Sequence, residues 1–116
     1  PHDVFKRDQE TILCDLPIPL TTAILGGIVD VPTMTGKTRM RIAAGTQSGT
    51  VLRIPGKGMP ALKGGKRGDQ LVKVVIETPV NLTDLQKAAL ESLNLTDTNQ
   101  PIQEAFRKKA ARFLDH

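Results

Sequence analysis

Residues 45–79 read GTQSGTVLRIPGKGMPALKGGKRGDQLVKVVIETP and guide the interpretation of the whole chain. Seven glycines, at positions 45, 49, 56, 58, 64, 65 and 68, predict turns with positive φ and places where two backbone segments approach closely. The stretch has no histidine and no cysteine, and Asp69 and Glu77 are its only carboxylates. It therefore predicts loops between strands and offers no groups for catalysis.

Alternating apolar residues predict strands on both sides of these loops. Residues 11–19 have the pattern of a half-buried strand with four inward side chains: Ile12, Cys14, Leu16 and Ile18. Pro17 places that strand at an edge or beside a bulge, because proline cannot donate to a ladder. Further strands are expected over residues 28–32, 38–43, 51–54 and 69–77. The last, interpreted as the longest, has almost no polar face, which predicts a central strand covered on both sides.

Helix signals separate and follow the strands. Residues 20–27 predict one or two helical turns, with Thr21 or Thr22 as the N-cap. Thr83 and Gln86 have the spacing of a capping box, which predicts a helix that closes the β domain over residues 1–95. After a linker at 96–100, a helix over 101–116 carries a stripe about 120° wide. The stripe consists of Ile102, Phe106, Ala110, Phe113 and Leu114.

The composition argues against several kinds of site. His2 and His116 lie near the two ends of the 116 residues, so no pair of nucleophile and base is predicted. Cys14 is the only cysteine, which argues against an internal disulfide or a multi-cysteine zinc site and predicts a small core residue. No apolar run approaches the roughly 20 residues that span a membrane. A soluble, cytoplasmic protein with no catalytic residue and no metal is expected.

The net charge of +4 leaves a basic nucleic-acid-binding module as an alternative function. However, the glycine-rich stretch has no aromatic residue that could stack on bases. Its basic side chains are interpreted as a solvated loop or, alternatively, as a docking patch for an acidic peptide tail. The residues of that patch are Lys57, Lys63, Lys66 and Arg67.

Three segments occur in an order that resembles one known family. They are PHDVFKRD at 1–8, LPIPLTTAILGGIVDVPTMTGKTRMRIAAGTQSGTVLRIPGKGMP at 16–60 and RGDQLVKVVIETP at 67–79. Together they resemble the second C-terminal domain of DnaJ-family J-domain co-chaperones, and most closely that of bacterial members that carry a zinc module. Gln9 departs from the family, which often has glycine there.

The resemblance implies a mainly β fold, a two-sheet sandwich with a short helix between strands, a closing helix and a C-terminal dimerisation helix. It implies a non-enzymatic co-chaperone fragment that binds unfolded client proteins, forms a homodimer through the stripe defined above and delivers clients to a DnaK-type ATPase chaperone. Exposed loop residues that could contact a client are Met59, Pro60 and Leu62. No cofactor is expected here, since zinc would belong to an upstream module, and no J domain is expected within these 116 residues.

Overall fold

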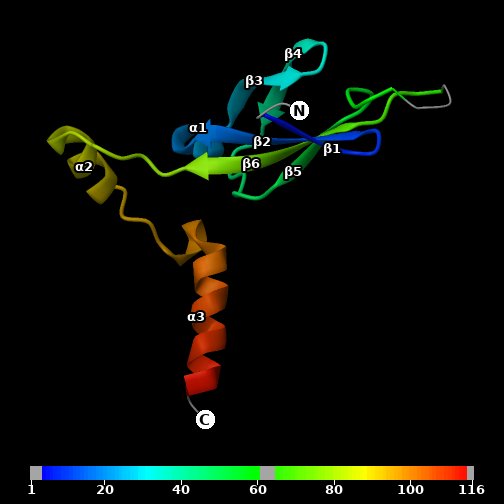
Figure 1. Ribbon diagram of the computed structural model, residues 1–116. Coiled ribbons are helices and arrows are strands. Elements are labelled where there is room, and N and C mark those ends of the chain that lie inside the picture. The colour runs from blue at the N-terminus through cyan, green and yellow to red at the C-terminus, as the bar shows by residue number, and fades with distance from the viewer. Residues whose placement is uncertain (1–3, 61–64, 115–116) are drawn as a thin grey trace. The chain divides into compact units, whose positions relative to one another are not determined.

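The computed structural model describes residues 4–60 and 65–114. Two compact units are formed, and they divide between Pro79 and Val80. The first unit contains both β-sheets and a short helix, and the second contains the C-terminal helices (Figure 1).

The larger sheet has four strands in the order β1-β2-β6-β5. Their bounds are β1 Phe5–Asp8, β2 Thr11–Pro19, β5 Val51–Ile54 and β6 Gln70–Glu77. β1 is antiparallel to β2, and β5 is antiparallel to β6. The two central strands, β2 and β6, are parallel, with Ile12 opposite Gln70 and Ile18 opposite Ile76. A pairing between distant segments thus forms the middle of the sheet.

The second sheet is an antiparallel hairpin, and a short helix leads into it from β2. The helix is α1 (Leu20–Leu25), and the strands are β3 (Gly27–Thr33) and β4 (Gly36–Ile42). The side chain of Thr33 stabilises the turn, because its hydroxyl donates to the carbonyl of Gly36 at 3.0 Å. This arrangement places α1 and the hairpin beside the larger sheet (Figure 1).

Aliphatic side chains from the larger sheet, α1 and β4 form the core. Its buried members are Ile18, Ala23, Ile42 and Val74, and half-buried side chains packed against them are Leu16, Val29, Met40, Leu52 and Ile76. One polar contact also crosses between the sheets, since the buried Gln70 donates from Nε2 to the carbonyl oxygen of Pro32 at 2.9 Å. Apolar burial therefore provides most of the attraction between the two sheets.

The base of the glycine-rich loop is a close crossing of three backbone segments. Met59 N–H donates to the carbonyl of Glu10 at 2.8 Å. Gly58 N–H donates to the carbonyl of Gly68 at 2.8 Å, and Gly68 N–H donates to the carbonyl of Met59 at 2.9 Å. A Cβ atom on Gly58 would lie 2.6 Å from the carbonyl oxygen of Asp69, and one on Gly68 would lie 2.7 Å from Cβ of Glu10. Glycine is therefore required at these two positions because the backbone segments lie too close for a Cβ atom, and not because of a positive φ.

Asp69 ties the same loop to β5. Its Oδ2 pairs with Nε of Arg53 at 2.9 Å, and its Oδ1 accepts from the N–H of Gly56 at 3.0 Å. The carboxylate that follows Gly68 in the sequence thus stabilises the turn leaving β5.

The second unit contains two helices and a short 3-10 turn. They are α2 (Asp84–Glu91), η1 (Asp97–Asn99) and α3 (Pro101–Leu114). The predicted capping box is present: Gln86 N–H donates to Oγ1 of Thr83 at 3.1 Å, and Thr83 N–H donates to Oε1 of Gln86 at 2.8 Å. Arg107 on α3 forms an ion pair with Asp97 of η1, which fixes the turn to the helix.

The two-sheet fold, its short helix and the C-terminal helices confirm the fold expected from the sequence. Three local predictions were wrong. No strand was expected at β1, because three of its four residues are charged. Such a composition is suited to an exposed edge strand. Pro19 is the N-cap of α1 in place of a threonine. β6 is one residue shorter than β2 and is buried on one face only, because Lys73 and Val75 are exposed.

The domain boundaries expected at 95 and 100 remain a prediction. In the structure the compact units divide between Pro79 and Val80, and α2 lies in the second unit.

Candidate functional site

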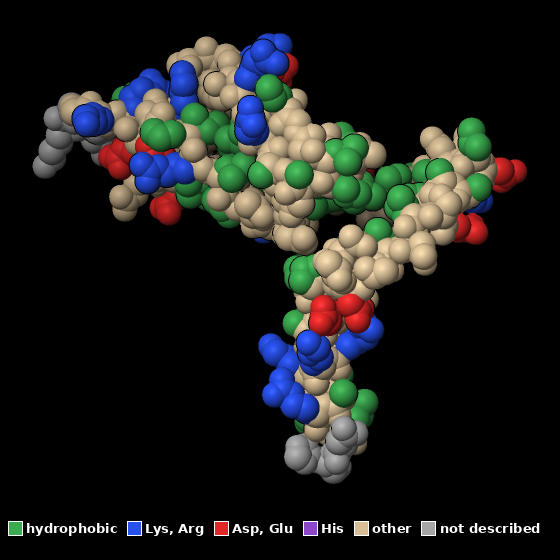
Figure 2. All heavy atoms as spheres, turned by 180° about the vertical axis from the view of Figure 1, so that it is seen from behind, with side chains coloured by type: hydrophobic (Ala, Val, Ile, Leu, Met, Phe, Trp, Pro, Cys, Tyr) green, Lys and Arg blue, Asp and Glu red, His purple; other side chains and the backbone are tan. Residues whose placement is uncertain are grey.

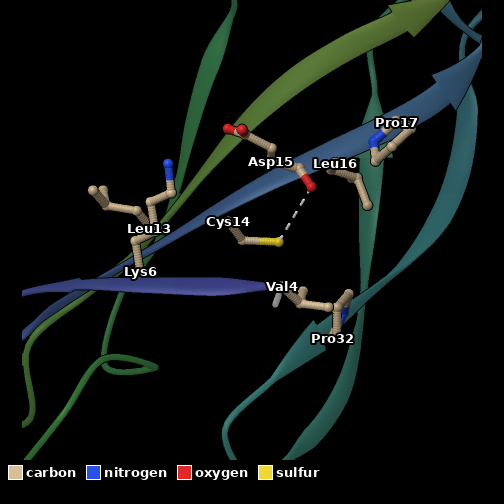
Figure 3. Close-up of a pocket in the computed structure, with 8 residues that line it drawn as sticks. All are labelled: Val4, Lys6, Leu13, Cys14, Asp15, Leu16, Pro17 and Pro32. Atoms are coloured by element: carbon tan, nitrogen blue, oxygen red, sulfur yellow. Dashed lines mark hydrogen bonds between the residues drawn. The ribbon is translucent and has the colours of Figure 1, made fainter. Parts of the chain in front are cut away.

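A mostly apolar hollow of about 360 Å³ lies between β1, β2 and the end of β3 (Figure 3). Its lining consists of Val4, Lys6, Leu13, Cys14, Asp15, Leu16, Pro17 and Pro32. Within it, the sulfur of Cys14 points toward the backbone carbonyl of Asp15, while the Asp15 carboxylate points away from Val4 and Pro32 (Figure 3). The hollow thus combines apolar side chains with a backbone acceptor.

The edge of β2 beside this hollow is only partly paired. β6 pairs with β2 from Ile12 to Pro19, whereas β1 pairs with it only from Thr11 to Cys14. Ile12 N–H donates to Asp69 on the β6 side at 3.0 Å. Because backbone groups alternate sides along a strand, Asp15 and Pro17 direct their carbonyls to the other side. Within the described residues, no strand covers that side beyond Cys14.

Cys14 is buried at the floor of the hollow, as expected of a small core residue. Burial raises the pKa of the Cys14 thiol, and the negative charge of Asp15 acts in the same direction. A thiol that stays protonated is a poor nucleophile. Cys14 therefore contributes packing to this site, with its sulfur 3.8 Å from the Asp15 carbonyl oxygen.

The raised pKa of Cys14 predicts a loss of stability at alkaline pH. The stabilisation that comes from the neutral Cys14 thiol is fully present below the ordinary thiol pKa. It is lost as the pH rises from there through the pKa of the folded state, because in this range the thiol ionises only in the unfolded state. We expect the urea midpoint of the wild type to fall more steeply with rising pH in this window than that of Cys14→Ala. Parallel curves would contradict this expectation.

The loop residues proposed as client contacts are partly used by the fold itself. Met59 is half-buried and its N–H is bonded to Glu10, whereas Pro60 is exposed. Leu62 lies outside the described residues. The structure does not bring Met59 or Pro60 into the lining of the β2 hollow.

The basic residues of the same loop differ in their surroundings. Lys66 is exposed and Lys57 is half-buried, and Lys63 lies outside the described residues. Arg67 donates from Nε to the carbonyl of Gly58 at 3.0 Å, so its guanidinium braces the close crossing of the loop. Docking of an acidic tail at these residues remains a prediction.

The stripe on α3 is exposed. The exposed fractions are 66% for Ile102, 67% for Phe106, 80% for Phe113 and 77% for Leu114, and Ala110 is half-buried. None of the side chains described in α2 or α3 is buried. Basic side chains gather along α3 (Figure 2), and one of them, Lys108, pairs with Glu104 at 3.0 Å. The helix is thus amphipathic and presents both of its faces to solvent.

Among residues 4–60 and 65–114, no group of three or more His, Cys, Asp or Glu side chains could hold a metal ion. No helix in the described part of the chain is long and apolar enough to cross a membrane.

The comparison with protein families decides the relationship. The family described as "DnaJ C terminal domain" matches residues 1–79, which are also the residues of the first compact unit. The chain belongs to the DnaJ family. This is a family of chaperones that are not enzymes, and the resemblance to a C-terminal domain of bacterial DnaJ proteins is confirmed.

Bacterial DnaJ chaperones extend the match through the C-terminal helices. "Chaperone protein DnaJ" of Opitutus terrae is 44% identical over 115 residues, which cover 97% of this chain and 30% of the relative. The protein of the same name from Cereibacter sphaeroides is 45% identical over 116 residues, with 98% and 30% covered. The chain therefore spans less than a third of the length of these relatives.

Sequence reasoning did not predict the hollow, because it is formed by three strands whose pairing was not foreseen. One signal was available. Pro17 was expected to place this strand at an edge of the sheet or beside a bulge. The strand lies instead between β1 and β6, but β1 pairs with it only as far as Cys14. Combined with the alternation of β2, that signal points to an open edge beside inward apolar side chains.

Proposed function

We propose that this chain is the second C-terminal domain of a cytoplasmic DnaJ-type co-chaperone, in which it binds unfolded client segments and forms a homodimer. In the full-length protein, clients would pass to a DnaK-type ATPase chaperone. This part of the protein would bind no cofactor, and zinc would belong to an upstream module. Unfolded clients, a second copy and the DnaK-type chaperone are the proposed partners.

The observation that carries client binding is the edge of β2 beside the apolar hollow, which no strand among residues 4–60 and 65–114 pairs beyond Cys14. Unfolded chains expose apolar side chains together with backbone N–H groups that need acceptors. An extended segment could place a side chain in the hollow of about 360 Å³ while its N–H groups bond to the carbonyls of Asp15 and Pro17. Strand addition of this kind is a recurring mode of peptide recognition, in which the main chain supplies affinity and pockets supply selectivity.

Homodimerisation is supported by the exposed apolar surface of α3. Four of its large side chains are at least 66% exposed. Burial of four such side chains would contribute about 6 to 12 kcal/mol at about 1.5 to 3 kcal/mol each. The cost of association is estimated at about 4 to 15 kcal/mol, so other parts of the partner would have to add area for a tight dimer.

A dimer would also strengthen client holding. Two hollows connected through α3 could engage two segments of one unfolded chain. The second contact would then be intramolecular, with an effective concentration on the order of millimolar. Weak binding at each hollow would be sufficient for useful retention.

Val4→Asp tests the client site, because Val4 lines the hollow and is 49% exposed. The new carboxylate would have to be desolvated when an apolar segment enters, so we expect peptide affinity to fall by about tenfold. The measurement is fluorescence anisotropy of a labelled heptapeptide of alternating valine and leucine with a lysine at each end.

Val51→Asp provides the matched control. Val51 is 55% exposed, lies on β5 and does not line the hollow, so the variant introduces the same charge away from the hollow. Equal losses in the two variants would argue against the hollow as the client site. A steep, log-linear loss of wild-type binding with salt would point to an electrostatic binding module instead.

A further inference from the structure

The two prolines of β2, Pro17 and Pro19, both lie on the side of the strand that faces away from β6. Ile12 directs its N–H to β6, so residues at odd positions direct their backbone groups the other way. The β2–β6 register continues without a break from Ile12 to Pro19, which preserves this alternation. Beyond Asp15, the open side of β2 therefore offers carbonyl oxygens and no N–H group.

The difference between the two sides of β2 has consequences for any strand that is added there. A full antiparallel ladder requires each bonded residue to donate and to accept. At Pro17 an added segment can donate its N–H, but its own carbonyl finds no donor and must stay in contact with water. A buried carbonyl without a partner is costly, whereas one that keeps water is tolerated.

We propose, on the basis of the client site inferred above, that Pro17 is a specificity-determining residue of that site. It leaves the β2 edge beyond Asp15 with acceptors only, which favours short extended segments that supply N–H donors and one apolar side chain. Pairing is limited to the region of Asp15 and Pro17, next to the hollow. Binding stays weak at each site. Long strands, including β2 of a second copy, cannot form a continuous ladder of hydrogen bonds along β2. Edge prolines elsewhere also oppose such pairing.

Pro17→Thr tests this role, because it restores the missing N–H with a residue suited to strands. One additional backbone hydrogen bond should tighten binding of the valine-leucine heptapeptide by about two- to tenfold. Pro19→Thr is the matched control: it adds an N–H on the same side of the same strand, but Pro19 caps α1 and does not line the hollow. Its affinity should stay within about twofold of the wild type. Circular dichroism melting curves verify that each variant is folded.

N-methylated peptides supply a second measurement that needs no variant. Methylation at alternate positions removes the N–H groups that face β2 in one set and those that face solvent in the other. Wild-type affinity should fall for one set only. Loss in neither set, or equally in both, would overturn the acceptor-only edge.

The possible outcomes separate the two levels of the proposal. Binding by the wild type that weakens in Val4→Asp, without a gain in Pro17→Thr, would overturn the role of Pro17 and leave the client site standing. An equal gain from Pro17→Thr and Pro19→Thr would also overturn it, because the effect would then not depend on register. Absence of peptide binding by the wild type, Pro17→Thr and Pro19→Thr alike would overturn both the client site and this inference.

Discussion

Replacing Gly68 with alanine is expected to destabilise the β-rich unit by about 3 to 5 kcal/mol, through overpacking against backbone and the loss of hydrogen bonds. The new Cβ would lie 2.7 Å from both the carbonyl carbon and Cβ of Glu10, and closer still to the carbonyl oxygen of that residue. Backbone has no rotamer with which to avoid this contact. The crossing would have to open, which weakens the bonds from Gly68 to Met59 and from Met59 to Glu10.

The size of this effect is large relative to the stability of the unit. At about 0.05 to 0.15 kcal/mol per residue, a unit of this length has a free energy of unfolding of roughly 4 to 12 kcal/mol. Gly68→Ala could therefore remove a large part of it. Urea unfolding of the full chain, followed by far-UV circular dichroism in the strand region, measures the loss.

Gly49→Ala is the control that separates close approach from backbone conformation. Gly49 has φ +90 and no atom within 4 Å of a Cβ placed on it, so alanine there meets only conformational strain. That strain costs about 1 to 2 kcal/mol. Equal shifts of the unfolding midpoint for the two variants would contradict the close crossing at Glu10.

The second large effect is expected from Phe106→Asp combined with Phe113→Asp, which should yield a monomer that stays folded. Both side chains are more than half exposed and make no part of a buried core within the described residues. Loss of their burial in a dimer would cost about 3 to 6 kcal/mol, a weakening of roughly a hundredfold to ten-thousandfold. Sedimentation velocity over a range of concentrations measures the change, and an unchanged circular dichroism spectrum shows that the fold persists.

The control for this pair is Lys108→Gln combined with Arg112→Gln. These positions lie on the side of α3 opposite the stripe, and the substitutions change the net charge by the same two units. We expect the control to sediment as the wild type does. A wild type that is monomeric at all concentrations, or a phenylalanine variant that remains dimeric, would eliminate the stripe as the interface.

The local signals of the sequence predicted most elements of the fold. Alternation in β2 and the glycine of the β3–β4 turn have their effects within a few residues, and the capping box at Thr83 acts over three. Such signals do not depend on the rest of the chain. These local signals did not predict β1, because an exposed strand of mainly charged residues has no apolar period.

The candidate site was less predictable, because its parts come together only through pairing over long distances. Pro17 and Cys14 could each be interpreted alone, as an edge residue and a core residue. Nothing local shows that Val4 and Pro32 lie beside them. In the same way, the glycines of the loop predicted turns and close approach of backbone segments, but not that the neighbour of Gly58 and Gly68 in space is Glu10.

By itself, the sequence determined the family, the strand and helix periods, and the amphipathic character of α3, since these depend on residue type and spacing along the chain. Only the tertiary structure decided that β2 and β6 are parallel neighbours and that β1 stops at the level of Cys14. It also decided that the resulting edge opens onto an apolar hollow. Strand pairing depends on which distant segments can bury their apolar faces together, and that choice is made by the packing of the whole unit.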